Sequence, residues 1–246
     1  MIDIDMIRDL TNAFGPSGFE EEVVKVIGRY LKDMEVENDA MNNVYAWFRN
    51  SGAPDTYGTG SGFPGNAGSR RRPVIMLDAH TDECGFMVQG IMDNGLLSMV
   101  MLGGMDLASL PAHTVLVRTR SGKKVRGIIT SRPVHFMTEK EKNAPLDIEG
   151  LYIDVGASSR EEAEETYGIH IGDPAAPEVA FDYDGDHGLC FGKAFDNRLG
   201  CACVIQTMRE LKDADQELAV DVAGAFAAQE EVGMRGAGVT AARIQP

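Results

Sequence analysis

Long apolar runs, a signal peptide and a cysteine framework are all missing from this sequence. No stretch of about 18 apolar residues occurs, so the sequence predicts no membrane-spanning helix. The N-terminus has no basic segment followed by an apolar core, so no signal peptide is predicted either. The four cysteines, Cys84, Cys190, Cys201 and Cys203, match neither a zinc ribbon nor a dense disulfide pattern. We therefore expect buried free thiols in a cytoplasmic protein.

Basic residues are also scarce. The chain has 23 Lys and Arg against 38 Asp and Glu, which gives a formal net charge of −15. A surface this acidic repels phosphate groups, so neither nucleic acid nor an anionic membrane is an expected partner. With 246 residues, 43% of them apolar, the chain is long enough for one large domain or two ordinary ones.

Helical periodicity opens the chain. Ile7, Leu10 and Phe14 form an apolar stripe at helical spacing. Ser17 followed by Glu20 is the pattern of a capping box, which predicts that a second helix begins there. The apolar positions of this second helix are Val23, Val24, Ile27, Leu31 and Met34.

Two strands are predicted next, separated by a loop. Val44 to Phe48 has the composition of a strand. Residues 50–71 are rich in Gly, Ser and Pro, which indicates a surface loop. Residues 73–78 form a short apolar run, typical of a strand that is buried on both faces.

The residue pattern of the sequence changes between Glu83 and about Arg132. Short β-rich runs alternate with turn signals such as Asp93-Asn94-Gly95, so we expect five or six short strands in a barrel-like or PDZ-like unit. We expect an α/β fold with a mixed sheet and flanking helices that this β-rich insert interrupts. The predicted division is residues 1–82 and 183–246 for the α/β domain and residues 83–182 for the insert.

After the insert the α/β pattern resumes near Gly188. A helix is predicted over residues 197–212, then a strand over residues 218–228 and a helix from Arg235. The core positions predicted for the first of these helices are Leu199, Ile205, Met208 and Leu211.

Three polar segments lie where a site could form. His80-Thr81-Asp82 follows a predicted strand, Asp196 opens a predicted helix, and Glu230-Glu231 follows another strand. Each segment alone has an ordinary structural explanation, such as a satisfied polar group, a helix cap or a solvated surface. Together they offer imidazole and carboxylate, the ligands that zinc, cobalt and manganese accept.

The spacing within these segments suits a metal centre. An Asp two residues after His80 can orient the imidazole. Adjacent glutamates point to different sides, so one of Glu230 and Glu231 can bind metal while the other remains free as a base. A carboxylate such as Asp196 can bridge two metal ions, the arrangement that activates water in aminopeptidases.

These segments closely resemble motifs of the M42 family of metallo-aminopeptidases, in content and in order. The matching segments are Asp78-Ala79-His80-Thr81-Asp82-Glu83, Phe195-Asp196-Asn197-Arg198 and Glu230-Glu231-Val232-Gly233-Met234-Arg235-Gly236-Ala237. Weaker similarity extends to Phe14-Gly15-Pro16-Ser17-Gly18, Gly103-Gly104, Pro133-Val134-His135 and Tyr152-Ile153-Asp154-Val155-Gly156-Ala157.

The resemblance implies a zinc-peptidase-like mixed sheet and a role for each site residue. It implies that His80 binds one metal ion, Glu231 binds a second, and Asp196 bridges the two. Asp82 would orient His80, and Glu230 would be the general base for the attacking water. The implied activity is removal of N-terminal residues from short peptides with two divalent ions, Zn, Co or Mn; the native metal and the preferred residue stay open.

The resemblance also concerns assembly and completeness. It implies that the insert is a dimerisation domain, that dimers build a tetrahedral dodecamer, and that His135 can reach a neighbouring subunit's site. The family uses two further ligands, an Asp and a His, which we do not find before Pro246. We therefore expect a C-terminally truncated chain with an incomplete centre and an open sheet edge.

Two other functions stay open. Some relatives are labelled endoglucanases, but neighbouring glutamates are badly placed for glycoside hydrolysis, and Trp47 is the only tryptophan that a sugar platform could use. Alternatively, the chain is a non-catalytic assembly module that acts through its β-rich insert.

Overall fold

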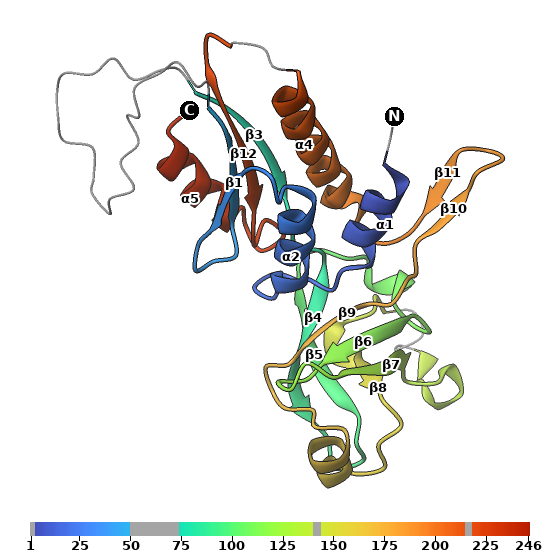
Figure 1. The fold of residues 1–246 in the computed structure, drawn as a ribbon. Coiled ribbons are helices and arrows are strands. Elements are labelled where there is room, and N and C mark those ends of the chain that lie inside the picture. Colours follow the sequence, from blue (N-terminus) through green and yellow to red (C-terminus); the bar gives the residue numbers. More distant parts are fainter. Residues whose placement is uncertain (1–2, 50–73, 140–143, 215–217) are drawn as a thin grey trace.

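The computed structural model describes residues 3–49, 74–139, 144–214 and 218–246. It consists of a four-stranded sheet flanked by helices and a closed β-barrel at one end of it (Figure 1). The chain enters the barrel directly after strand β3 and leaves it through β9, so the sheet is built from segments on both sides of the barrel. The expected mixed α/β fold with a β-rich interruption is confirmed. The loop predicted over residues 50–71 lies outside the described residues.

The sheet has the order β1-β2-β12-β3. Its strands are β1 (Glu35–Asn38), β2 (Val44–Phe48), β3 (Val74–His80) and β12 (Asp221–Ala227). β1, β2 and β12 pair antiparallel, whereas β12 and β3 run parallel, with Ala227 beside His80. This parallel pair brings two strand ends to the same edge of the sheet.

Helices cover both faces of the sheet (Figure 1). They are α1 (Ile4–Asn12), α2 (Glu21–Tyr30), α4 (Phe195–Asp213) and α5 (Arg235–Ile244). Side chains of α1, α2 and α4 bury one face in a core that includes Leu10, Ile27 and Ile205. On the other face Ile244 of α5 packs with Tyr45. Alternate residues of β2 therefore point to opposite cores.

Burial of β3 is only partial, which corrects the expectation of a strand buried on both faces. Every residue of β12 is buried, but Ile75 of β3 is 50% exposed. The difference follows from position, because β12 lies between two strands and β3 is at the edge of the described sheet.

The inward face of α4 differs from the prediction in one place. Ile205 and Met208 are fully buried as expected, but Leu199 is 38% exposed and Arg198 is fully buried instead. Asp196 has non-helical backbone angles, so the regular helix begins after it. On that helix Leu199 precedes Ile205 by six residues, about 240° around the axis, and so lies on another face.

Two further local predictions are corrected. Ser17 does not cap α2: the N-cap is Glu20, with no side-chain hydrogen bond to the helix, and Ser17 contacts a distant carboxylate. The cysteines are free as expected, but only Cys201 is fully buried and Cys203 is exposed. Two residues apart on a helix, their side chains point in different directions.

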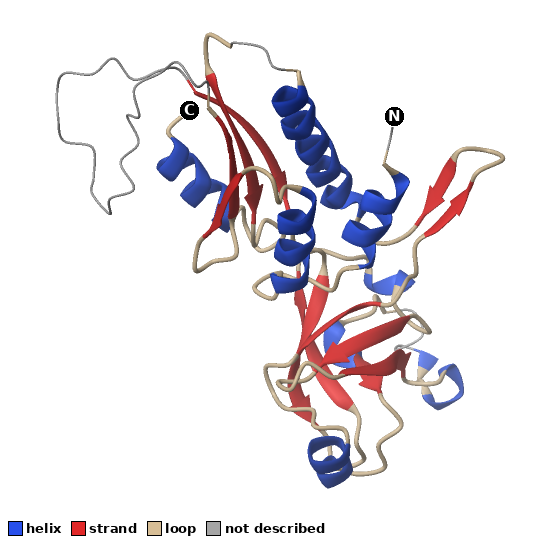
Figure 2. Ribbon diagram, in the orientation of Figure 1, coloured by secondary structure: helices blue, strands red, loops and turns tan. Residues whose placement is uncertain are grey.

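The barrel closes in the order β4-β5-β8-β7-β6-β9. Figure 2 shows its strands in red below the four-stranded sheet. Its strands are β4 (Gly85–Ile91), β5 (Leu97–Leu102), β6 (Thr114–Arg118), β7 (Lys124–Ser131), β8 (Leu151–Asp154) and β9 (Pro174–Pro177). Inward and outward residues alternate along β6 and β7, so Val115, Val117, Val125 and Ile129 fill a separate apolar core. Closure leaves the barrel without free strand edges.

Short elements complete the structure. They are η1 (Leu107–Ser109), η2 (Val134–Phe136), η3 (Ile148–Gly150), the π-helical turn η4 (Glu162–Thr166) and a hairpin of β10 (Asp182–Asp184) and β11 (Leu189–Phe191). Among the described residues, no helix has the length and apolar content needed to cross a membrane.

A matched pair of substitutions tests the assignment of the inward face of α4. Ile205→Ala should lower the free energy of unfolding by about 2–5 kcal/mol, because it opens a cavity in the core. Leu199→Ala should lower it by less than about 1 kcal/mol, because the side chain is partly solvated already. Urea denaturation measures both, and equal losses would show that the helix face is wrongly assigned.

Candidate metal centre

The parallel strands β3 and β12 end side by side, and the residues that follow them carry the candidate site. His80 is the last residue of β3 and pairs in register with Ala227 of β12. The Thr81 amide donates to the Ala227 carbonyl at 2.8 Å, so the two chain segments stay together beyond the sheet. Asp82 follows on one side, and Glu230 and Glu231 on the other. The carboxyl end of parallel strands is a usual place for a ligand site in α/β folds.

Four candidate ligand side chains meet at this edge. His80 Nε2 lies 2.9 Å from Asp196 Oδ1 and 3.8 Å from Glu230 Oε2. One ligand atom each from His80, Glu230 and Glu231 lie within 4.8 Å of one another. Asp196 joins this group through its contact with His80. It reaches the site from α4, and its side chain is 85% exposed, whereas that of His80 is 9% exposed.

Asp82 is fully buried and connects the two strand ends. Its Oδ1 accepts the Glu230 amide at 2.9 Å, and its Oδ2 accepts the Glu231 amide at 3.1 Å. Ser17 Oγ donates to Oδ2 at 2.6 Å. Burial alone would raise the pKa of the Asp82 carboxyl, but these hydrogen bonds and that of His80 lower the pKa below its usual value. The carboxylate is therefore charged and holds both glutamates by their backbone.

The contact of Asp82 with His80 is looser than its contacts with the glutamates. His80 Nδ1 lies 3.2 Å from the Asp82 carbonyl oxygen and 3.5 Å from its Oδ1. Both oxygens are acceptors, so they favour a proton on Nδ1 and leave Nε2 for a ligand or a second proton.

The charge around His80 favours a cation. Burial lowers the pKa of His80, but hydrogen bonds and charges of Asp82, Asp196 and Glu230 outweigh burial and raise the pKa to about 9. The imidazole thus keeps a proton because three carboxylates surround it. A divalent ion with imidazole and carboxylate ligands meets the same need, so the donor set fits zinc, cobalt or manganese.

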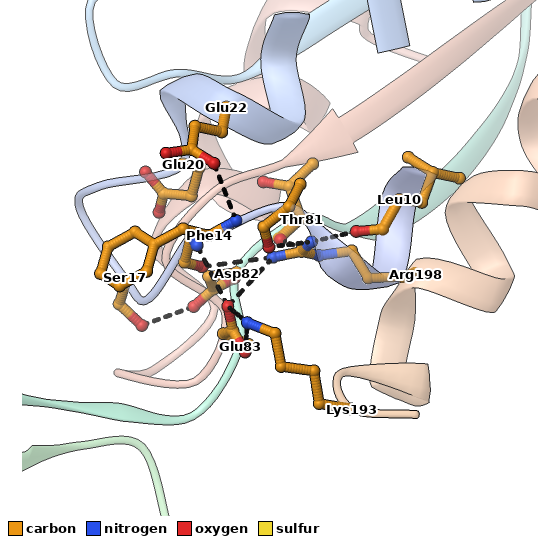
Figure 3. A network of polar contacts seen from close by, with 12 residues as sticks. Leu10, Phe14, Ser17, Glu20, Glu22, Thr81, Asp82, Glu83, Lys193 and Arg198 are labelled. Atoms are coloured by element: carbon orange, nitrogen blue, oxygen red, sulfur yellow. Dashed lines mark hydrogen bonds and ion pairs between the residues drawn. The ribbon is translucent and has the colours of Figure 1, made fainter. Parts of the chain in front are cut away.

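A buried cationic network supports the segment behind the site (Figure 3). Arg198 donates to the carbonyl oxygens of Leu10 at 2.6 Å and Thr81 at 2.5 Å. Lys193 Nζ contacts both carboxylate oxygens of Glu83, at 2.6 and 2.7 Å. Burial lowers the pKa of Arg198 and of Lys193, although the charge of Glu83 opposes this. These residues tie α1, α4 and the end of β3 together.

Sequence reasoning gave Arg198 no role. Arg198 lies in the motif Phe195-Asp196-Asn197-Arg198, but nothing about an isolated Arg at the start of a helix indicates that it is buried.

A pocket of about 370 Å³ opens beside the ligand side chains. Asp196 and Glu231 line it from one side, Lys193 with Glu83 from another, and Met105 from the barrel. Gly104, which follows Gly103 after strand β5, also lines the pocket from the barrel side. At Gly103, where φ is +95°, a Cβ atom would lie 3.1 Å from Glu231 Cβ. A glycine there lets the backbone approach the ligand side chain closely.

The other histidines do not join this site. In the parts of the chain that the structure describes, His80, Glu230 and Glu231 form the single group of three or more candidate ligands at metal-binding distances. His187 instead contacts Asp184 at 2.7 Å in the turn of the β10–β11 hairpin. The roles predicted for His80, Asp82, Asp196, Glu230 and Glu231, and for His135 toward a neighbouring subunit, stay predictions.

The chain is similar in sequence to a known family of peptidases. Residues 60–246 match the family model described as M42 glutamyl aminopeptidase. The chain is 34% identical to FrvX of Escherichia coli (strain K12) over 247 residues, which is 100% of this chain and 62% of that protein.

Two solved structures share the fold along nearly the whole chain. A TET aminopeptidase from the marine sediment archaeon Thaumarchaeota archaeon SCGC AB-539-E09 is 35% identical with a TM-score of 0.86, covering 99% of this chain and 62% of that one. The Pyrococcus horikoshii TET1 peptidase, which can assemble into a tetrahedron or a large octahedral shell, is 28% identical with a TM-score of 0.79, covering 99% and 66%. The chain thus spans less than two thirds of the length of these relatives. The family match over residues 60–246 and the identity to FrvX show that it belongs to the M42 peptidase family.

Proposed function

We propose that this chain contributes the catalytic centre of an aminopeptidase that removes N-terminal residues from short peptides. The observation that carries the proposal is the meeting of His80, Glu230 and Glu231 within 4.8 Å, with Asp196 against His80. Membership of a family described by glutamyl aminopeptidase activity supports the reaction class.

His80, Asp196 and Glu231 are the proposed ligands of two divalent ions, zinc, cobalt or manganese. When bound, such ions polarise a peptide carbonyl and lower the pKa of water. Asp196 would hold the ions from the start of α4, and His80 and Glu231 would hold them from the strand ends.

Glu230 is the proposed general base. Its Oε2 lies 3.8 Å from His80 Nε2, beside the proposed ligands. From there Glu230 removes a proton from the attacking water and later gives it to the leaving amine. Asp82 holds the Glu230 backbone at 2.9 Å, so it fixes the base without touching the reacting atoms.

The two units of the chain divide the work in this proposal. Residues 1–82 and 183–246 form the catalytic α/β domain, and residues 83–182 form a dimerisation insert. The ability of the P. horikoshii relative to assemble into a tetrahedron or a large octahedral shell supports self-association. Within such an assembly the substrates are short peptides, and the pocket beside Asp196 and Glu231 receives the N-terminal residue.

Glycoside hydrolysis is the less favoured chemistry. It requires two carboxyl groups that flank the scissile bond. Glu230 and Glu231 are consecutive residues of one loop, and the Asp82 carboxylate holds both of their amides. Two carboxylates placed in this way are better suited to bind ions than to flank a glycosidic bond. A purely structural assembly role is the second alternative.

Substitution of the proposed base tests the reaction. Release of p-nitroaniline from an aminoacyl-p-nitroanilide panel, with cobalt or zinc added, measures the reaction, and any activity of the chain should be lost with EDTA. Glu230→Gln should lower kcat by about 10²- to 10⁴-fold, because the amide cannot accept the proton. Glu210→Gln, on the exposed side of α4, is the matched control and should keep the wild-type rate.

Three outcomes of this assay would contradict the proposal. Full activity of Glu230→Gln would exclude the assigned base. Hydrolysis of a soluble cellulose, lost in the same variant, would favour the glycosidase. Absence of both metal binding and hydrolysis of any panel member would favour the assembly role.

Substitution of the proposed ligand His80 tests the metal centre by stability. Cobalt at about 100 times its dissociation constant should stabilise the chain by about 2.7 kcal/mol, because the ion binds only the folded state. His80→Ala should abolish most of that gain in a thermal melt. His187→Ala removes a histidine that also contacts a carboxylate, outside the site, and should leave the gain unchanged. Equal gains in all three proteins would place the ion elsewhere.

A further inference from the structure

Four consecutive backbone amides lead into the ligand loop, and buried side chains accept all four. The Ala228 amide donates to Asn43 Oδ1 at 2.9 Å, and the Gln229 amide to Glu20 Oε1 at 3.2 Å. The next two, from Glu230 and Glu231, donate to the two oxygens of Asp82. Although these residues lie beyond the end of strand β12, each of the four amides has a side-chain acceptor that fixes the backbone.

Ser17 donates a further hydrogen bond to Asp82. Its hydroxyl donates to Asp82 Oδ2 at 2.6 Å in a buried environment, across 65 residues of sequence. The same oxygen accepts the Glu231 amide. Without the hydroxyl, Asp82 Oδ2 would keep one donor fewer in a place that water does not reach, and the carboxylate could rotate toward other donors.

Glu20 holds the residue before the ligand pair. It is fully buried, and its Oε1 accepts the amides of Gly18 at 2.7 Å and Gln229 at 3.2 Å. Its Oε2 accepts Asn42 Nδ2 at 3.1 Å. Gln229 has a positive φ of 55°, a conformation that a non-glycine residue keeps only where its surroundings impose it.

Ser17 and Glu20 belong to one short segment before α2, and Figure 3 shows both beside Asp82. The segment is attached to the body of the protein independently of the loop. Gly15 donates to Glu83 Oε1 at 3.1 Å, and the Gly15 carbonyl accepts the Glu83 amide at 3.0 Å. The segment is thus a fixed frame against which the loop with Glu230 and Glu231 is placed.

We propose that Ser17 and Glu20 are positioning residues of the metal centre. They set the backbone of Gln229, Glu230 and Glu231 so that the ligand and the base face His80. This inference rests on the proposed function, which identifies the ligand beside this loop as a divalent ion. Neither residue touches the ion or the substrate, and Glu20 acts as a hydrogen-bond acceptor rather than through its charge.

Cobalt absorption and affinity test this role on the full chain. Cobalt(II) is titrated into the wild type and into Ser17→Ala, Glu20→Ala and Glu20→Gln, while the visible d–d spectrum is recorded. The two alanine variants should bind cobalt about 10- to 100-fold more weakly, the usual effect of losing a partner behind a ligand, and with a changed spectrum. Glu20→Gln should stay within about threefold of the wild type, because its amide oxygen can still accept the Gln229 amide.

Glu22→Ala is the matched control. Glu22 lies in the same region and accepts the Phe14 amide at 3.2 Å and Lys124 at 2.8 Å, and neither of these donors belongs to the loop. It should keep the wild-type affinity and spectrum. Wild-type cobalt affinity and spectrum in Ser17→Ala and Glu20→Ala, at whatever thermal stability, would overturn the proposal. The same holds if Glu22→Ala weakens binding as much as they do.

Hydrogen exchange of the metal-free chain separates this inference from the proposed function. The amides of residues 229–231 should exchange at least about tenfold faster in the alanine variants than in the wild type, because they lose an acceptor or its support. If the wild type binds no cobalt, the proposed function fails, but faster exchange confined to these amides still supports the positioning role. Unchanged exchange would overturn it in either case.

Discussion

The Asp82 carboxylate is the contact on which the site depends. It is fully buried, and it accepts the amides of Glu230 and Glu231 and the hydroxyl of Ser17. A buried charge is tolerated only when its hydrogen bonds are complete, so the groups around it have little freedom. The hydrogen bonds to Asp82 fix the backbone of the two glutamates, and the backbone sets the direction of their side chains even without a bound ligand.

The fold supplies what this contact needs. Parallel pairing of β3 with β12 brings His80 and the residues after Ala227 to one edge of the sheet. Asp196 must then arrive from a third segment, and the buried Arg198 anchors the start of α4 to the carbonyl oxygens of Leu10 and Thr81. The barrel adds the Gly103 turn against Glu231, so both units of the chain contribute to the surroundings of the site. Stability and site geometry therefore share the same buried polar network.

Local patterns predicted much of this structure, and long-range contacts account for what they missed. The periodicity of α1, the β2 run and the turn signals of the barrel are carried by neighbouring residues, so the sequence reveals them. The candidate ligands were found because residue types and motif order agree with a known family. Ser17 was wrongly predicted as a helix cap because its partner Asp82 lies 65 residues away. Leu199 was wrongly placed in the core because it lies six residues before Ile205, about 240° around the axis of α4, and so on another face of the helix.

The location of bound metal tests the central claim most directly. Crystals of the full chain grown with zinc, measured on both sides of the zinc absorption edge, would show each ion as an anomalous difference peak. The account predicts peaks in contact with His80 Nε2, Asp196 and Glu231, with the amides of Glu230 and Glu231 still on Asp82. Peaks only at other sites, such as the His187–Asp184 turn, or a loop released from Asp82 when the ion is bound, would contradict it.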